Sequence, residues 1–364
     1  MKLLFDGRYI RTDHHDGISK FSARLVEKIE TLAVAQGIRL SVLISDPRQA
    51  AQFPSHIQTH LISSPTSPRE PWVAHQVNRL TPDVVFSPMQ TMGSAGRRYR
   101  LVLTIHDLIY YAHPTPPSQF NFFIRLLWRL YHLSWWPQRF LLSKADAVVA
   151  VSATTKSLIV DNKLSRKPVH VVHNAADIAR ELHTPHQRDV SKRLVYMGSF
   201  MPYKNVDTLV HALAQLPDYE LHLLSRIENK EQERLRALEP GAKLVFHNGC
   251  SEEDYAKALA GAHALLMASK DEGFGIPVVE AMAAGTPVVL SDIPIFREVA
   301  GPAGLLVENS PEGFVHGITA LENPALWQQC SKAGVIQART FSWQRSAQEL
   351  VDVLIQVVRT KTSR

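Results

Sequence analysis

The fold is decided by the stretch Glu272-Gly273-Phe274-Gly275-Ile276-Pro277-Val278-Val279-Glu280, which sets two carboxylates eight positions apart around two glycines and a proline. The apolar run 264–269 before it predicts a buried strand. The run 277–285 predicts a helix, because Pro277 suits a first helical turn and Gly285 suits a helix end. In such a strand–turn–helix unit, backbone N–H groups and the helix N-terminus favour an anion above the sheet. Two carboxylates at a phosphate site indicate a sugar nucleotide, which offers hydroxyls as well as phosphates.

Strand and helix patterns alternate along the whole chain. Runs rich in Val, Ile and Leu predict parallel strands that are covered on both faces. Six fall in the first half and six in the second, at 3–5, 40–44, 84–86, 101–105, 147–151, 169–172, 194–197, 221–224, 244–246, 264–267, 288–290 and 304–307. Helices are predicted between them, for example at 18–35, 206–216, 252–260 and 312–321. The alternation predicts right-handed βαβ units and doubly wound sheets, an α/β fold.

A polar stretch at 177–192 marks the expected domain boundary, because it has little apolar content and a new strand follows it. We therefore expect two Rossmann-like domains, residues 1–182 and 183–342. Ligands of open α/β sheets bind beyond the carboxyl ends of the strands, so two such sheets facing each other would enclose a cleft for two substrates. The last segment, 343–364, contains an amphipathic helix over 343–360.

With 364 residues, of which 45% are apolar and 20% charged, the chain has the composition of a soluble globular protein of about two domains. Its two cysteines, Cys250 and Cys330, are expected to be reduced in a cytoplasmic protein. The N-terminal residues are charged too early for a signal peptide, and no apolar run approaches the roughly 18 residues of a membrane span. The net charge of +6 and the pI of about 9.3 suit an anionic membrane surface or anionic substrates. No compact nucleic-acid-binding motif appears, so we expect no nucleic-acid partner.

The deciding stretch resembles the E-x7-E signature of the retaining glycosyltransferases of family four. The similarity extends over Ser269–Pro277 and Glu280–Val289, and then to Ser291, Asp292 and Glu298. The alternative, an ordinary βα turn with two surface glutamates, gives no folding reason for Glu272 in a Gly-Phe-Gly turn. The resemblance implies the GT-B architecture, in which two Rossmann-like domains face each other across a cleft. It also implies that the helix in 343–364 crosses back onto the first domain.

A second strand–turn–helix pattern runs from Tyr196 to Asn205 and carries Lys204 at the helix start. A cation there opposes the helix dipole unless a phosphate lies between them. The element resembles the family's Lys-Asn pair, which binds the donor diphosphate. Many relatives carry Arg directly after the glycine, where this chain has Ser199, and Arg226 after the next strand is a candidate to replace that cation. The alternative for Lys204 is a solvated surface lysine.

The first half carries two further candidate elements. Gly17 begins a Gly-Ile-Ser sequence where a loop opens a helix, and the family places such an element near the donor phosphate and the acceptor. The preceding residues 13–16, Asp-His-His-Asp, are metal-ligand types, but four neighbours in sequence point different ways and do not converge readily on one ion. His106 and Asp107 end a buried strand and match the family's His-Asp element, whose histidine approaches the donor sugar. A hydrogen-bonded histidine that caps the next segment is the alternative.

Residues 120–136 are rich in aromatic residues and leucine, and Arg125, Arg129 and His132 recur in them at helical spacing. Such a helix could lie in a bilayer interface and hold a lipid-linked acceptor. More often, an apolar helix of this length packs in the core against a sheet. The basic cluster 97–100 is expected to be a solvated loop.

The resemblance implies a catalytic set of three residues. Glu272 would bind the hydroxyls of the donor sugar, His106 would lie beside that sugar, and Lys204 would stabilise the departing diphosphate, where negative charge grows in the transition state. No candidate nucleophile for a double displacement appears, so a front-face reaction is expected, in which the leaving phosphate helps to take the acceptor's proton. The family usually needs no catalytic metal, and none is expected here.

The implied substrate-binding set surrounds these residues. Glu280 would bind the ribose hydroxyls of the nucleotide, while Phe274 and Gly275 would offer backbone amides to the sugar or the diphosphate. Domain closure would exclude water and limit hydrolysis of the donor. The full set is Gly17, Asp107, Ser199, Arg226, Gly273, Phe274, Gly275, Ile276 and Glu280.

The expected reaction is transfer of a sugar from a GDP- or UDP-linked donor to a glycan or lipid-linked acceptor, in polysaccharide or glycoconjugate assembly. The first half, with its Asp6-Gly7-Arg8 and Gly17-Ile18-Ser19 sequences, looks closest to mannosyl- and rhamnosyltransferases, which favours GDP-mannose. We expect a cytoplasmic enzyme, with peripheral contact to the inner membrane surface as a further expectation.

Two other functions remain open. A nucleotide-sugar epimerase or hydrolase on the same fold would turn over the donor without an acceptor. A non-catalytic nucleotide-sugar-binding subunit would bind the donor and transfer nothing, although such a relative would be free to lose Glu272, His106 and Lys204. A dinucleotide oxidoreductase is disfavoured, because Asp6-Gly7-Arg8 follows the first strand in place of a Gly-x-Gly-x-x-Gly sequence.

Overall fold

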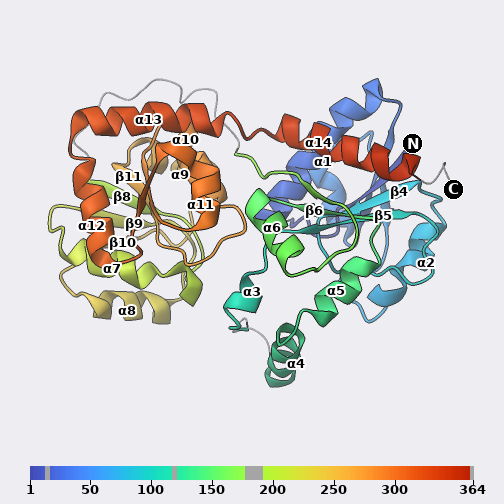
Figure 1. Cartoon of the computed structure of the whole chain (residues 1–364), viewed down its shortest axis with the longest axis horizontal. Coiled ribbons are helices and arrows are strands. Elements are labelled where there is room, and N and C mark those ends of the chain that lie inside the picture. Colours follow the sequence, from blue (N-terminus) through green and yellow to red (C-terminus); the bar gives the residue numbers. More distant parts are fainter. Residues whose placement is uncertain (13–16, 117–120, 177–191, 361–364) are drawn as a thin grey trace. The chain divides into compact units, whose positions relative to one another are not determined.

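Each half of the chain forms a parallel β-sheet with helices packed against it (Figure 1). The structure is a computed structural model, and it describes residues 1–12, 17–116, 121–176 and 192–360. Its contacts divide the chain into a first unit, Met1–Ala175 with Ser342–Arg364, and a second unit, Ala176–Phe341. The predicted boundary between 182 and 183 falls outside the described residues. The expected cleft between two facing domains stays a prediction.

The first sheet has seven parallel strands in the order β3-β2-β1-β4-β5-β6-β7. The sequence predicts six strands here, and β3 is the one it missed. This edge strand is only partly buried and reads Gln-Thr-His-Leu, so it lacks the apolar run that marks a buried strand. The strands are β1 (Lys2–Asp6), β2 (Arg39–Ile44), β3 (Gln58–Leu61), β4 (Val84–Ser87), β5 (Arg100–Ile105), β6 (Ala147–Ala150) and β7 (Val169–Val171).

The second sheet has six parallel strands in the order β10-β9-β8-β11-β12-β13. In both sheets the strand order reverses beside the first strand of the unit, between β1 and β4 and between β8 and β11. The chain crosses to opposite faces at such a point, which leaves a crevice at the carboxyl ends of the strands. The prediction of doubly wound parallel sheets is therefore confirmed. The strands are β8 (Arg193–Tyr196), β9 (Glu220–Leu223), β10 (Leu244–Phe246), β11 (Ala264–Met267), β12 (Val288–Ser291) and β13 (Gly304–Val307).

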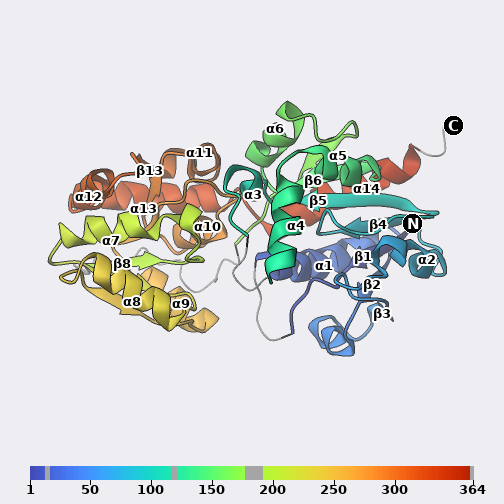
Figure 2. The ribbon, with the colours of Figure 1, turned by 90° about the horizontal axis from the view of Figure 1, so that it is seen from below.

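Helices connect the strands in both units (Figure 2), and the four predicted helices correspond to α1, α7, α9 and α12. The first unit contains α1 (Gly17–Ala35), α2 (Val73–Asn78), α3 (Ile109–Ala112), α4 (Phe122–His132), α5 (Trp136–Ser143), α6 (Ala153–Asp161) and α14 (Trp343–Arg359). The second contains α7 (Val206–Ala214), α8 (Asn229–Leu238), α9 (Glu252–Ala260), α10 (Ile276–Ala283), α11 (Pro294–Ala300), α12 (Pro311–Ala320) and α13 (Pro324–Ala338). Short 3₁₀ helices are η1 (Pro47–Gln52), η2 (Glu70–Trp72), η3 (Pro202–Lys204) and η4 (Gly301–Ala303).

The C-terminal helix α14 packs against α1 of the first unit (Figure 1), which confirms that the chain crosses back. Its apolar face buries Trp343 and Leu350. The rings of Trp343 and Phe21 have their centroids 6.1 Å apart. The Ser346 hydroxyl donates a 2.7 Å hydrogen bond to the His173 carbonyl, which ties the helix to the segment after β7. The amphipathic pattern of the last segment thus completes the first unit.

Two local expectations for the first unit are wrong. The sequence favours core packing for 120–136, yet no residue of α4 is buried. The basic cluster is not a free solvated loop, because Arg97 and Arg100 form ion pairs of 2.7 and 2.6 Å with Asp146. None of the helices in the described ranges combines the length and the apolar character that crossing a bilayer needs.

Candidate active site

The sequence signature lies in the turn between β11 and α10 of the second unit. Gly275, at the start of α10, has a φ of 90°, a left-handed conformation that favours glycine. An added Cβ there would lie 3.1 Å from the Phe296 ring. The glycine therefore allows a tight reversal, which brings Glu272 and the first turn of α10 to the carboxyl edge of the sheet, beside its switch point.

Lys204 and Glu272, which are 68 positions apart, form an ion pair at this edge. The Lys204 Nζ lies 2.5 Å from the Glu272 Oε1, and the Ser269 hydroxyl donates a 2.8 Å hydrogen bond to the same oxygen. Only 12% of the lysine side chain and 8% of the glutamate side chain are exposed. In such a poorly solvated place each charge depends on the other for compensation. The pair explains how a carboxylate can occupy a turn that favours anions.

The residues after Lys204 fix its position. Asn205 has a φ of 55°, a left-handed conformation that asparagine tolerates. Its side-chain amide donates hydrogen bonds of 2.7 Å to Thr208 and 2.9 Å to Asn309. Asn309 in turn donates a 3.0 Å hydrogen bond to the carbonyl of Ala268, at the end of β11. The sequence reasoning missed Asn309. The sequence feature that could have pointed to it is its position directly before Ser310 and Pro311, where α12 begins.

Glu280 lies one turn inside α10, and its carboxylate accepts a 3.0 Å hydrogen bond from the Tyr255 hydroxyl of α9. Burial, followed by the nearby Glu280 charge, raises the pKa of Tyr255 well above its ordinary value. The phenol therefore stays protonated and can donate. The sequence reasoning missed Tyr255, because no local pattern relates it to a glutamate in another helix. The contact fixes the orientation of the carboxylate.

Ser199 and Arg226 follow β8 and β9 at the same carboxyl edge. The Ser199 carbonyl accepts a 2.5 Å hydrogen bond from the buried Tyr196 hydroxyl, so the backbone of this residue helps to close the turn. Arg226 packs against Gly249, where an added Cβ would lie 3.0 Å from the arginine Cγ. That Arg226 replaces the missing cation of the family stays a prediction.

His106 lies at the carboxyl edge of the first sheet, directly after β5. Its Nε2 is 2.8 Å from the Pro88 carbonyl. A carbonyl can only accept, so Nε2 carries the hydrogen of this bond. The imidazole also meets the Phe21 ring of α1 edge-on, with the centroids 5.1 Å apart. These two contacts orient the ring at the end of the strand.

Asp107 and Gly17 belong to the same edge of the first unit. The Asp107 carboxylate accepts a 3.1 Å hydrogen bond from the backbone N–H of Ile109, so it caps the turn that leads into α3. Gly17 is the first residue of α1. The metal-ligand pattern at 13–16 lies outside the described residues. Within the residues that the structure describes, no group of three or more side chains could hold a metal ion.

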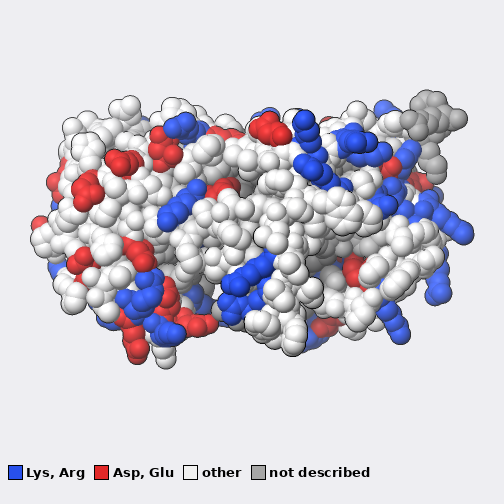
Figure 3. Space-filling model, turned by 60° about the horizontal axis from the view of Figure 1, so that its bottom comes forward, with Lys and Arg blue, Asp and Glu red and all other residues white. Residues whose placement is uncertain are grey.

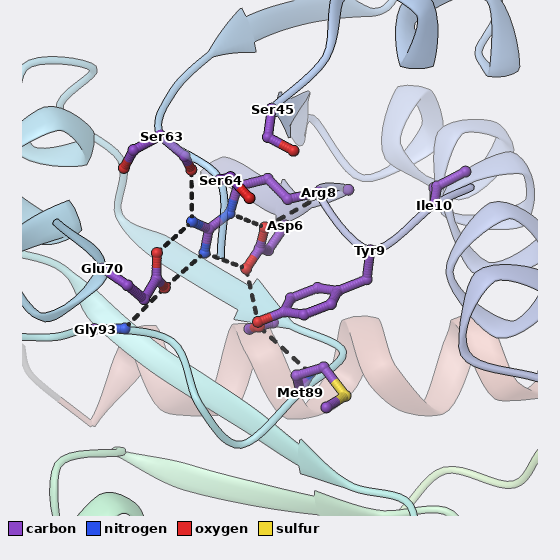
Figure 4. A network of polar contacts seen from close by, with 12 residues as sticks. Asp6, Arg8, Tyr9, Ile10, Ser45, Ser63, Ser64, Glu70, Met89 and Gly93 are labelled. Carbon is purple, nitrogen blue, oxygen red and sulfur yellow. Dashed lines mark hydrogen bonds and ion pairs between the residues drawn. The ribbon is translucent and has the colours of Figure 1, made fainter. Parts of the chain in front are cut away.

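A buried ion network closes the carboxyl end of β1 (Figure 4). The Arg8 guanidinium donates two hydrogen bonds to Asp6 and two to Glu70, of 2.7 and 3.0 Å in each case, and a further one of 3.0 Å to the Ser63 carbonyl. All five of its N–H groups are thereby used. Glu70 also accepts a 3.2 Å hydrogen bond from the Gly93 N–H. The network joins β1, η2 and the segments after β3 and β4, a role that the sequence reasoning missed.

Comparisons with known protein families agree with this two-part organisation. The pattern of Glycosyltransferase Family 4 matches residues 22–180, and that of Glycosyl transferases group 1 matches residues 179–335. The chain belongs to glycosyltransferase family 4. The resemblance that the signature at 272–280 suggests is therefore confirmed. Both units of this family-4 glycosyltransferase contribute to the match.

Two curated mannosyltransferases are similar to this family-4 glycosyltransferase. The MMP alpha-(1->4)-mannosyltransferase of Mycolicibacterium hassiacum is 34% identical over 221 residues. That match covers 57% of this chain and 53% of the relative, so the aligned part spans about half of the relative's length. The O-antigen chain mannosyltransferase B of Escherichia coli is 26% identical over 70% of each chain.

Solved structures show the same fold over nearly the whole chain. Sucrose-phosphate synthase from Thermosynechococcus elongatus has a TM-score of 0.76 at 17% identity, over 99% of both chains. Anabaena Alr3699/HepE, solved with UDP and glucose, has a TM-score of 0.73 at 19% identity, over 98% of this chain and 100% of that one. At these identities the likeness shows the fold alone, and it confirms that this family-4 glycosyltransferase has the predicted GT-B class.

Proposed function

We propose that this glycosyltransferase moves mannose from GDP-mannose to a hydroxyl of a glycan or lipid-linked acceptor, with retention of configuration at the anomeric carbon. The observation that carries the proposal is the Lys204–Glu272 ion pair beside the N-terminus of α10, with Glu280 one turn further on. A cation, two carboxylates and a helix N-terminus suit a ligand that has both phosphates and hydroxyls. The two similar mannosyltransferases support mannose as the sugar.

In the proposed complex, the donor diphosphate lies between Lys204 and the first turn of α10, where Phe274 and Gly275 offer backbone amides. The lysine then divides its charge between the diphosphate and Glu272. The Glu272 carboxylate would accept hydrogen bonds from the sugar hydroxyls, and Glu280 would do the same for the ribose. This division explains why the site needs two carboxylates beside an anion.

In the proposed reaction, the bond between the anomeric carbon and the phosphate oxygen breaks, and GDP leaves with the electron pair. The acceptor oxygen forms its bond to the anomeric carbon on the same face of the sugar. The acceptor's proton passes to the departing phosphate. Lys204 stabilises the negative charge that grows on the diphosphate. His106 would contribute from the first unit beside the sugar, a role that rests on the family resemblance.

Transfer assays with GDP-mannose and with UDP-linked sugars test the proposal, with NMR used to read the anomeric configuration of the product. An α-linked mannoside from α-linked GDP-mannose is the expected product. A β-linked product contradicts retention. Release of free mannose at the same rate with and without acceptor supports the hydrolase instead. Donor binding without any turnover supports the non-catalytic subunit.

The Tyr255→Phe change is expected to weaken GDP binding about five- to tenfold, because it removes a hydrogen bond of about 1 kcal/mol that orients the Glu280 carboxylate. Isothermal titration calorimetry measures the effect. Tyr219→Phe is the matched control, since it removes a 2.9 Å hydrogen bond to Glu322 elsewhere in the second unit. An equal loss of affinity in both variants would show that Tyr255 has no specific role in donor binding.

We also propose that the enzyme acts in the cytoplasm and contacts the inner membrane surface when its acceptor is lipid-linked. Neither Cys250 nor Cys330 forms a disulfide, which suits a reducing compartment. The redox state of the two cysteines can be measured by lysing cells without a reductant, alkylating the free thiols and analysing the protein by mass spectrometry. Both thiols are expected to be alkylated, and a disulfide between them would contradict the assignment.

A further inference from the structure

Residues 121–169 of the first unit, from the start of α4 into β7, hold the charge excess of the whole protein. They contain eight Lys and Arg residues but only two Asp and no Glu, a net charge of +6 that equals that of the whole chain. The rest of the chain, with 32 basic and 32 acidic residues, is neutral overall. One of the two acids, Asp146, is already paired with Arg97 and Arg100. In Figure 3, where the lower side of Figure 1 comes forward, basic patches border uncharged surface.

Helix α4 within this segment turns its apolar side chains outward. At 100° per residue they fall on one face of the helix, and they are 45% to 77% exposed. The other face makes the contacts with the rest of the unit: the Trp128 ring lies 5.1 Å from the Tyr110 ring, and the Tyr131 hydroxyl donates a 3.1 Å hydrogen bond to Gln138. Folding therefore leaves the apolar face uncovered. This face comprises Phe122, Phe123, Leu126, Leu127, Leu130 and Leu133.

The residues that follow α4 form a basic groove, which is bounded by α5, α6 and the segment before β7. Its volume is about 900 Å³. The stacked rings of Trp136 and Phe140 form an apolar wall and are 68% and 50% exposed. No Asp or Glu is among the lining residues that the structure describes. α4 and α5 are joined by a short connection, and in Figure 1 α4 extends outward from the end of α5. The cations of the groove are Arg139, Lys156, Lys163, Arg166 and Lys167.

We propose that the apolar face of α4 and the basic groove together bind the surface of an anionic phospholipid bilayer. The helix face enters the boundary between headgroups and acyl chains, and the groove cations meet lipid phosphates. A bilayer supplies the apolar and the anionic component at once. A nucleic acid would leave the helix face in water. The inference rests on the proposed function in one respect. If the acceptor is lipid-linked, it lies in the bilayer, and binding to the bilayer surface places the enzyme beside it.

Vesicle flotation with the full chain tests the proposal. We expect the protein to float with vesicles of phosphatidylcholine mixed with phosphatidylglycerol and to stay unbound with phosphatidylcholine alone. High salt is expected to release it, because mobile ions screen the attraction between exposed charges. The proposal would be overturned if the protein bound neither kind of vesicle, or if it bound both kinds equally.

Two double variants separate the parts of the surface. Phe123→Asp with Leu127→Asp is expected to abolish vesicle binding, and Lys156→Glu with Lys167→Glu to weaken it by about fivefold or more for each lysine removed. All four positions are exposed, so the melting temperature should stay unchanged. The matched controls are Val34→Asp with Ile336→Asp, at positions 82% and 68% exposed, and Lys230→Glu with Lys243→Glu. The proposal is wrong if the test and control variants bind alike.

Two further readouts distinguish the alternatives. A concentration-dependent oligomer that Phe123→Asp with Leu127→Asp disrupts, without any vesicle binding, would assign the helix face to a second copy of the chain and overturn the proposal. Transfer to a soluble acceptor is expected to be unchanged in the surface variants. Wild-type protein that binds vesicles and transfers no sugar would reject the proposed function while leaving the membrane surface in place.

Discussion

Replacing Lys204 by methionine is expected to lower the kcat of sugar transfer by about 100- to 1,000-fold, because the variant loses the cation that meets the charge growing on the departing diphosphate. The KM for the donor should rise less, since α10 still offers its N-terminus to the phosphates. Steady-state kinetics with GDP-mannose measure both constants. Lys270→Met is the control, because this neighbouring lysine is exposed.

A double variant that also changes Glu272, the ion-pair partner of Lys204, separates the effect on catalysis from the effect on stability. In Lys204→Met the Glu272 carboxylate, whose side chain is only 8% exposed, has lost its cation, so the variant is also expected to lose stability. Lys204→Met with Glu272→Gln removes that charge, and it should recover melting temperature without recovering kcat. Two residues that act on one transition state give non-additive effects on the rate. Recovery of kcat in the double variant would show that Lys204 serves only the fold.

Replacing Arg8 by methionine is expected to reduce the free energy of unfolding by about 3–5 kcal/mol, because Asp6 and Glu70 would remain buried without their shared cation. The Arg8 and Asp6 side chains have no exposed surface, so water cannot compensate the loss. Denaturant unfolding measures the effect. The control is Arg345→Met, which breaks a 2.9 Å pair with Glu349 at an arginine that is 66% exposed. That change should remove less than about 1 kcal/mol.

A compensated variant distinguishes lost charge pairing from lost packing at Arg8. Arg8→Met with Asp6→Asn and Glu70→Gln leaves no charge in the network, so part of the stability should return. Equal stability of the single and the triple variant would show that packing around the guanidinium, rather than charge compensation, dominates. A loss below about 1 kcal/mol in the single variant would contradict the assigned role of the network.

The order of strands and helices could be predicted because buried parallel strands leave apolar runs in the sequence. The exception is β3, whose residues Gln58–Leu61 form a partly exposed edge strand. The turn at Gly275 could also be predicted, since its glycines and Pro277 mark the start of a helix. The exposed face of α4 could not be predicted. From the sequence alone, a leucine-rich helix is expected to lie in the core. Only the contacts of Trp128 and Tyr131 show which face of α4 packs against the rest of the unit.

The contacts of the site depend on strand order, which apolar runs do not specify. Lys204 meets Glu272 because β8 lies beside β11 in the sheet, although two strands separate them in the chain. The family signature named both residues, but not their pairing. Tyr255 and Asn309 carry no signature of their own. Their roles appear only when the helices and loops around the signature are in place.

Nucleotide binding to the second unit tests the central claim most directly. Melting temperatures would be compared with GDP, UDP, ADP, dTDP and their sugar conjugates, for the wild-type chain and for Glu280→Ala. A ligand at about 100 times its Kd stabilises a protein by roughly 2.7 kcal/mol, which is visible as a melting shift. We predict stabilisation by GDP and GDP-mannose that Glu280→Ala loses. The absence of a shift with every nucleotide would contradict the donor site at Lys204, Glu272 and Glu280.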